Sequence, residues 1–240
     1  MTPNNNMPPF TIAQVIRISF SVIGRNLVVL LGLSVALGLV ANQIHRVVLS
    51  GVENAVLFAV GEMVIYAATS ALFASSVVFT VASDARGSKG KLAPMLRCAV
   101  EAFGPVFVLS FLLNGLSALP WLITLVLFLA LHVVFWTALP ALVLERKGLV
   151  SALQLGSRHS RGKRWQVAGL ALVASAFFAV VLIGLWSLAP YGSMSDEHQA
   201  FWDIFVFAPI DVFFVVAMAV SYFLMNDSDP NEETVLSVFD

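Results

Sequence analysis

Three ionisable side chains fall within or beside the long apolar stretches of the chain: Glu62, His132 and Asp211. With about 1.5 Å of rise per residue, His132 and Asp211 come near the centre of a bilayer-crossing helix. A charge at that depth is costly, so such a residue normally faces a polar cavity or a partner and indicates function. We expect a proton-linked or a neutral hydrogen-bonded His132–Asp211 pair, or an Asp211 solvated where Pro209 breaks the helix. Glu62 precedes a span expected to begin at Val64 and is placed in the outer interface.

The densest group of positive charge lies just before a long apolar run. It consists of Arg158, Arg161, Lys163 and Arg164, followed by Trp165. Basic residues beside a membrane attract anionic lipid head groups by about 1 kcal/mol each, and tryptophan is typical of the membrane interface. The cluster therefore fixes the topology of the chain, binds a lipid head group or phosphate, or binds a protein partner, and the sequence leaves these alternatives open.

Patterns that would indicate metal binding or catalysis are missing from the sequence. The four histidines are not spaced like metal ligands, and Cys98 is the single cysteine, which we expect to be a small, half-buried, reduced thiol. There is no GxSxG, P-loop or HExxH motif. We therefore predict no catalysis, no cofactor and no metal site.

Composition places all of these residues in a membrane. Of the 240 residues, 59% are hydrophobic and only 11% are charged, too few charges for a soluble domain. Twelve of the 13 Lys and Arg residues fall into three stretches, at 17–25, 86–97 and 146–164, separated by apolar runs. The positive-inside rule then predicts a multi-pass protein of the bacterial inner membrane with both termini in the cytoplasm.

A helix needs about 20 apolar residues to cross the hydrocarbon, and this length divides the chain into six spans. Backbone groups in lipid must be satisfied within a helix, so we predict an all-α bundle. Small residues around Gly38 and between Ala67 and Ser76 predict close helix packing. The predicted spans are Leu27–Ile44, Val64–Ala82, Phe103–Ser117, Trp121–Leu144, Val167–Ala189 and Phe201–Met225.

A short amphipathic segment carrying basic residues precedes each odd-numbered span. Ile12 to Arg25 has an apolar stripe opposite polar residues, as expected of a helix lying in the interface, and an offset of 80 residues aligns it with the segment that begins at Leu92. We therefore predict a single membrane domain with a threefold repeat of one interfacial helix and two spans. The alternative is that chance similarity between Leu-rich segments produces the same alignment. The predicted units are 10–82, 91–144 and 149–225, with a disordered N-terminus at 1–9 and an acidic tail at 226–240.

From Ala138 onward the sequence contains Pro140, then Glu145, Arg146, Lys147 and Gly148, and then Gly162, Lys163, Arg164 and Trp165. This pattern resembles a known family, the bacterial membrane proteins related to the membrane domain of glycerophosphoryl diester phosphodiesterases. In that family a proline, a Glu-Arg-x-Gly turn, an Ala-Leu-x-x-Ser helix and a Gly-x-x-Trp recur. Tyr222 and the closing residues 236–240 are similar to the family's last segment. The matching residues are Ala138, Leu139, Pro140, Ala141, Leu144, Glu145, Arg146, Lys147, Gly148, Ala152, Leu153, Gly156, Ser157, Gly162, Lys163, Arg164 and Trp165.

The resemblance implies six spans and a cytoplasmic N-terminus, and it implies no assigned activity. The chain departs from the family's pattern near Leu127 and Phe128, where relatives carry Pro-Gly, and at Leu224 to Asn226, where relatives often carry Leu-Arg. The phosphodiesterase catalytic domain is missing from these 240 residues, so the family's enzymatic name is not transferred.

Taken together, the sequence predicts a non-enzymatic inner-membrane protein that binds membrane lipids, another membrane protein or a second copy of itself, and no nucleic acid. Its basic cytoplasmic segments would carry this binding. A transporter or channel for a small solute or for protons is the first alternative, with Glu62, His132 and Asp211 along the route and helices interrupted at Pro120, Pro140 and Pro209. An intramembrane lipid-modifying enzyme is the second alternative, for which no nucleophile or metal set is found.

Overall fold

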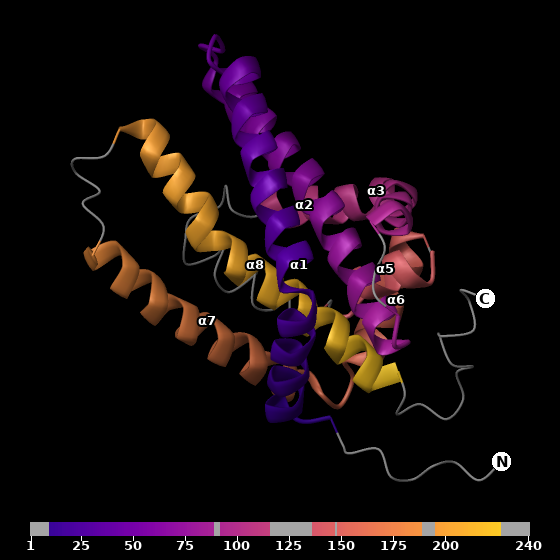
Figure 1. The fold of residues 1–240 in the computed structure, drawn as a ribbon. Helices are drawn as coiled ribbons and strands as arrows, with labels where there is room; N and C mark the ends of the chain where they lie inside the picture. Colours follow the sequence, from indigo (N-terminus) through magenta and orange to yellow (C-terminus); the bar gives the residue numbers. More distant parts are fainter. Residues whose placement is uncertain (1–9, 89–91, 116–135, 147, 189–194, 227–240) are drawn as a thin grey trace, which may run out of the picture.

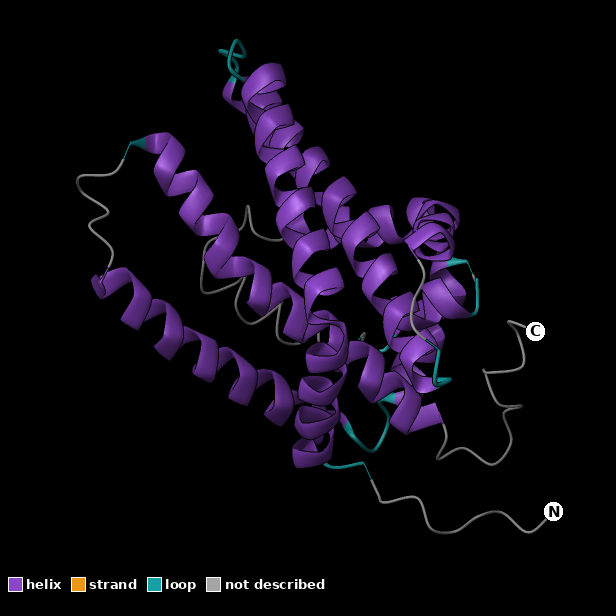
Figure 2. Cartoon of the chain, in the orientation of Figure 1, coloured by secondary structure: helices purple, strands orange, loops and turns teal. Residues whose placement is uncertain are grey.

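The computed structural model describes residues 10–88, 92–115, 136–146, 148–188 and 195–226, and every regular element among them is an α-helix. Figures 1 and 2 show long helices that cross one another, with short helices gathered at one side. The predicted all-α class is confirmed for this part of the chain. The helices are α1 (Ile12–Leu49), α2 (Ala55–Ala85), α3 (Leu92–Gly115), α5 (Ala138–Leu144), α6 (Leu149–His159), α7 (Arg164–Leu188) and α8 (Asp196–Asn226).

The first helix contains both the predicted interfacial segment and the first span. Its N-terminus is capped by Thr11, whose side chain accepts a hydrogen bond from the backbone N–H of Gln14. At Asn26 the backbone leaves helical geometry (φ −119°, ψ 19°), and the helix resumes directly beyond this kink. The kink falls where the amphipathic pattern changes to an all-apolar one, so the predicted junction between Arg25 and Leu27 is confirmed.

Helix α2 is longer than the predicted second span. It begins after Asn54, whose side chain caps the N–H groups of Val56 and Leu57, and it ends at Ala85. Glu62 lies two turns inside this helix, which is longer than a span requires, so its predicted position in the outer interface stays a prediction. Ala67, Ala71, Ala74, Ser75 and Ser76 are buried, which confirms the predicted close packing.

The predicted helix breaks differ from the structure in two further places. The amphipathic segment at Leu92 continues without interruption into the third span, through Pro105. Helix α8 likewise runs through Pro209, so the expectation that Pro209 breaks it is wrong. Proline removes one backbone hydrogen bond, and a long helix held by its neighbours tolerates that loss.

Five helices in the described part of the chain are long and apolar enough to cross a membrane: α1, α2, α3, α7 and α8. Most of the predicted fourth span, Trp121–Leu144, lies outside the described residues. Its described end is not one continuous helix, since a turn at Trp136 and Thr137 precedes the seven-residue helix α5. The sixth span and the threefold repeat therefore stay predictions, whereas several helices of membrane-spanning length and composition are observed.

The three basic stretches are brought to one end of the bundle. Arg25 binds Asp84 at the end of α2, and the Lys163 ammonium lies 5.7 Å from the ring of Phe10 ahead of α1. Arg146 forms an ion pair of 2.7 Å with Glu101 of α3. We call this the basic end; the opposite end carries the turn between α1 and α2 (Figure 1). Collecting the cationic residues at one end is the arrangement that the positive-inside rule requires.

Candidate functional site

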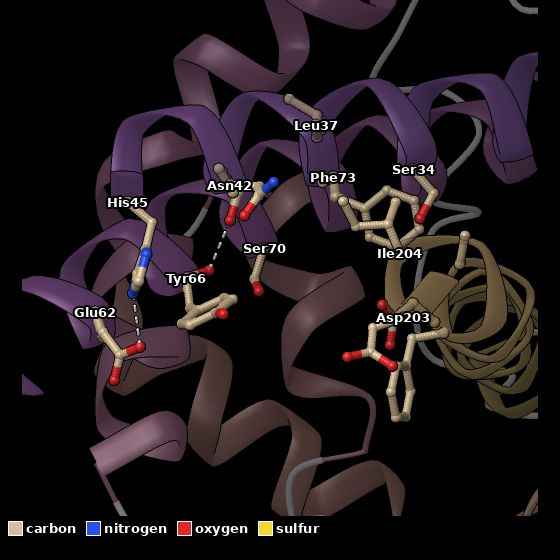
Figure 3. A pocket seen from close by; sticks show the side chains of 16 residues that line it. Ser34, Leu37, Asn42, His45, Glu62, Tyr66, Ser70, Phe73, Asp203 and Ile204 are labelled. Carbon is tan, nitrogen blue, oxygen red and sulfur yellow. Dashed lines mark hydrogen bonds and ion pairs between the residues drawn. The ribbon is translucent and has the colours of Figure 1, made fainter. Parts of the chain in front are cut away.

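A polar cavity of about 600 Å³ lies among the membrane-spanning parts of α1, α2 and α8. Figure 3 shows polar side chains from all three helices around this space. Its volume is within the range of small-molecule sites, about 300–1,000 Å³. The lining residues are Ser34, Leu37, Gly38, Ala41, Asn42, His45, Glu62, Tyr66, Thr69, Ser70, Phe73, Asp203, Ile204, Phe207, Ala208 and Asp211.

The cavity reaches the middle of the bundle. Ser70 is the sixteenth of the 31 residues of α2, and Asp211 is the sixteenth of the 31 residues of α8. At 1.5 Å per residue, each lies about 22 Å from both ends of its helix. Asp211 thus lies at mid-helix, the depth that its sequence position predicts. Ser70, Asp211 and Tyr66 remain exposed, so the cavity is open to its surroundings.

An ion pair joins α1 and α2 on the side of the cavity away from the basic end. His45 Nε2 lies 3.0 Å from Glu62 Oε1, and the two side chains are 32% and 36% exposed (Figure 3). The His45 ring also packs edge-on against Phe58, with the ring centroids 5.5 Å apart. Glu62 thus lies beside a histidine that can balance its charge.

The wall opposite α2 comes from α8, which contributes two carboxylates. Asp203 and Asp211 are eight residues apart, which corresponds to about 12 Å along the helix axis. Gly38 allows α1 to approach α8 closely beside them, because a Cβ at Gly38 would lie 2.9 Å from Ile204 Cγ2. The close packing predicted around Gly38 is confirmed, and it sets the width of the cavity on this side.

Between the cavity and the basic end, the bundle is packed with apolar side chains. Val77 and Val78 of α2 and Val216 of α8 are fully buried, and the rings of Phe20 and Phe213 join α1 to α8 at 5.3 Å. The described helices therefore close the cavity toward the basic end.

Beyond this packed layer, the kink of α1 is fixed by a bidentate ion pair. Arg25 Nε donates to Asp84 Oδ1 at 3.0 Å, and a second guanidinium nitrogen lies 2.5 Å from Oδ2. Asn26 Nδ2 donates to the same carboxylate at 3.2 Å. The Asp84 side chain is only 13% exposed, so its charge is compensated at a position with little water.

The predicted anion-binding cluster lies at the turn between α6 and α7. Arg158, Arg161 and Arg164 line this turn, and Lys163 is half-buried over Phe10. Burial lowers the pKa of the Lys163 ammonium. Trp165 is 89% exposed, as expected of an interfacial anchor.

The Glu-Arg turn after α5 fastens three helices. The Tyr222 hydroxyl of α8 donates to the Glu145 carboxylate, and Arg146, which has a positive φ of 51°, binds Glu101 of α3. Arg97 Nε donates to the same Glu101 at 2.9 Å. This part of the family-like pattern is therefore a packing device in the structure.

Two of the three predicted intramembrane residues, Glu62 and Asp211, line the same cavity. His132 lies outside the described residues, so its pairing with Asp211 stays a prediction. Sequence reasoning missed His45, Asp203 and Tyr66. A signal for His45 was present, since it lies 17 residues before Glu62 on the other arm of a helical hairpin.

Metal-ligating side chains do not gather in the described part of the chain, where no three His, Cys, Asp or Glu residues converge on one point. Cys98 is buried in α3. Comparisons with protein-family models, with curated proteins and with solved structures find no significant match for the chain.

Proposed function

We propose that this integral membrane protein is a small-solute transporter whose binding site is the cavity among α1, α2 and α8. The observation that carries the proposal is a polar cavity of ligand size that extends to the midpoints of α2 and α8. Polar groups at that depth are retained where they face water or a substrate, and transporter sites lie near the bilayer midplane.

The asymmetry of the bundle supports this proposal. The cavity is open, whereas the buried side chains of Val77, Val78, Val216 and Phe213 lie between it and the basic end. A site closed toward one side of the membrane is what alternating access requires of one of its states. In this proposal the basic end faces the cytoplasm of a bacterium and the chain has no catalytic role.

Uptake into proteoliposomes tests the proposal. Purified protein is reconstituted, incubated with a pool of metabolites, and the trapped solutes are identified by mass spectrometry. Ser70→Trp places an indole in the middle of the cavity and is expected to abolish the accumulation seen with the wild type. Val173→Trp, on a face of α7 that is 50% exposed, is the matched control and is expected to keep it.

Two results would count against a transporter. If liposomes with the wild-type protein accumulate no more solute than protein-free liposomes, the protein has no transport activity toward the solutes tested. Equal solute accumulation by the wild type and a correctly folded Ser70→Trp variant would show that the solute does not pass through the cavity.

The arginines at the α6–α7 turn favour a second role, the binding of anionic lipid or a membrane partner at the basic end. Replacing Arg158, Arg161, Lys163 and Arg164 by Gln is expected to reduce the anionic lipid retained in native mass spectrometry, since each basic group contributes about 1 kcal/mol. Arg46→Gln, at the opposite end, is the control. Unchanged lipid retention and unchanged partner pull-down would dismiss this role.

A further inference from the structure

The charge of the cavity restricts the ligand that it can take. Among the described residues that line it, three are carboxylic acids, one is histidine and none is Lys or Arg. The described lining can therefore carry negative charge, and apart from His45 it has no side chain that can carry positive charge. In the low-dielectric centre of a membrane this charge attracts a cation strongly and repels an anion.

The remaining walls are apolar and aromatic. Phe73, Phe207 and Ile204 face the same space as the acidic residues, and the Tyr66 ring lies near Glu62 (Figure 3). Side chains of this kind bind the hydrocarbon part of a ligand and attract cations to their ring faces. Apolar side chains do not supply ligands to a bare metal ion, so this wall fits an organic ligand better.

The spacing of the carboxylates also disfavours a metal ion. A metal ion is held by several ligands within about 2.6 Å of it, whereas Asp203 and Asp211 are separated by about 12 Å along α8. No convergent set of metal ligands is found among the described residues. A molecule several atoms long fits the spacing better.

We infer that the cavity recognises a small organic ammonium compound, with its cationic nitrogen at Asp211 of α8 and its hydrocarbon part against Phe73 and Phe207. This inference rests on the proposed function and names its substrate class. We assign the recognition to Asp211 because it lies at the midpoint of α8, one turn from Phe207 and across the cavity from Phe73 of α2. Glu62, which is paired with His45, has a smaller part.

Three compounds that share one hydrocarbon body test the inference. They are 2-phenylethylammonium, 2-phenylethanol and 3-phenylpropanoate, and their binding to the full chain in lipid nanodiscs is measured by calorimetry at neutral pH. We expect the ammonium compound to bind at least about tenfold more tightly than the alcohol and the carboxylate to show no binding, because a charge is costly to bury without a partner. Asp211→Asn is expected to weaken binding of the ammonium compound at least about tenfold, and Asp203→Asn, about 12 Å away along α8, is expected to weaken it less.

Glu53→Gln is the matched control, because it removes a carboxylate near the same end of the bundle without touching the cavity. It is expected to leave binding unchanged. If Asp211→Asn does not fold, Asp211→Glu retains the charge and is expected to keep measurable binding.

The outcomes separate this inference from the proposed function. Equal binding of the alcohol, any binding of the carboxylate, or unchanged binding by a folded Asp211→Asn variant would overturn the inference. So would an uptake experiment that identifies an anion or a neutral solute blocked by Ser70→Trp, although that result would leave the transporter proposal intact. If Ser70→Trp does not block uptake, both the transporter proposal and the inference about its ligand are contradicted.

Discussion

Gly156 is the position where the structure makes its sharpest prediction about stability. It lies inside α6 and is buried against the start of α5. A Cβ at this position would lie 2.9 Å from the Ala138 nitrogen and 3.0 Å from both its Cα and its Cβ. Two of these atoms belong to the backbone and cannot move aside as a side-chain end can. Gly156→Ala therefore has to push α5 and α6 apart.

Two effects of opposite sign decide the result of Gly156→Ala. Replacing glycine by alanine within a helix stabilises it by about 1 kcal/mol, whereas overpacking a buried contact costs about 1–3 kcal/mol. Since three atoms lie inside normal contact distance, we expect the cost to exceed the gain, with a net destabilisation of up to about 2 kcal/mol. Gly32→Ala in α1 is the control, because it does not precede a proline and no atom of another part of the protein lies within 4 Å of its Cβ position. It is expected to stabilise the protein by up to about 1 kcal/mol.

The free energy of unfolding in detergent micelles, followed by circular dichroism during titration with a denaturing detergent, measures both variants. Opposite signs for Gly156→Ala and Gly32→Ala would support the close approach of α5 and α6. A stabilisation of the same size in both variants would refute it.

Three further predictions concern the basic end. Tyr222→Phe removes the hydrogen bond to Glu145 and is expected to lower the free energy of unfolding by about 1–2 kcal/mol. Tyr66→Phe, whose side chain lies in the open cavity, is the control and is expected to lower it by less than about 0.5 kcal/mol in the same titration. Asp84→Asn is expected to lower the free energy of unfolding by about 1 kcal/mol, because Arg25 is 58% exposed and water screens its ion pair with Asp84. Arg97→Gln is the comparison, since its exposed ion pair with Glu101 stabilises the protein less. Equal costs for the two variants would contradict the role of Asp84 at the kink. Trp165→Ala is expected to lower the share of the Trp fluorescence that lipid-attached bromine quenches, because it removes a Trp at the membrane interface. An unchanged quenched share would contradict the interfacial position of Trp165.

The parts of the fold that can be predicted from the sequence are those governed by local patterns. The change from an amphipathic to an all-apolar pattern locates the kink at Asn26, and runs of small residues locate the packed face of α2. Both features depend on residues close together in the chain. Lipid as solvent makes such patterns strong, because an apolar run of sufficient length has few alternatives to a helix.

The parts that cannot be predicted depend on contacts between distant residues. The charge of Glu62 suggests the end of a span, whereas His45 compensates that charge within the hairpin of α1 and α2. Pro209 suggests a break, although α8 continues through it beside its neighbouring helices. The cavity itself is formed by three helices, and its lining combines residues up to 177 positions apart, from Ser34 to Asp211. No local pattern encodes that convergence.

Accessibility of Ser70 to a charged thiol reagent tests the central claim most directly, which is that a water-filled cavity reaches the middle of the membrane-spanning bundle. In a Cys98→Ser background, Ser70→Cys is treated in lipid nanodiscs with a cationic methanethiosulfonate reagent, and Val173→Cys on α7 is the lipid-facing control. We predict rapid labelling of Ser70→Cys, slowed by 2-phenylethylammonium, and little labelling of Val173→Cys. A Ser70→Cys variant that labels as slowly as Val173→Cys would contradict the account.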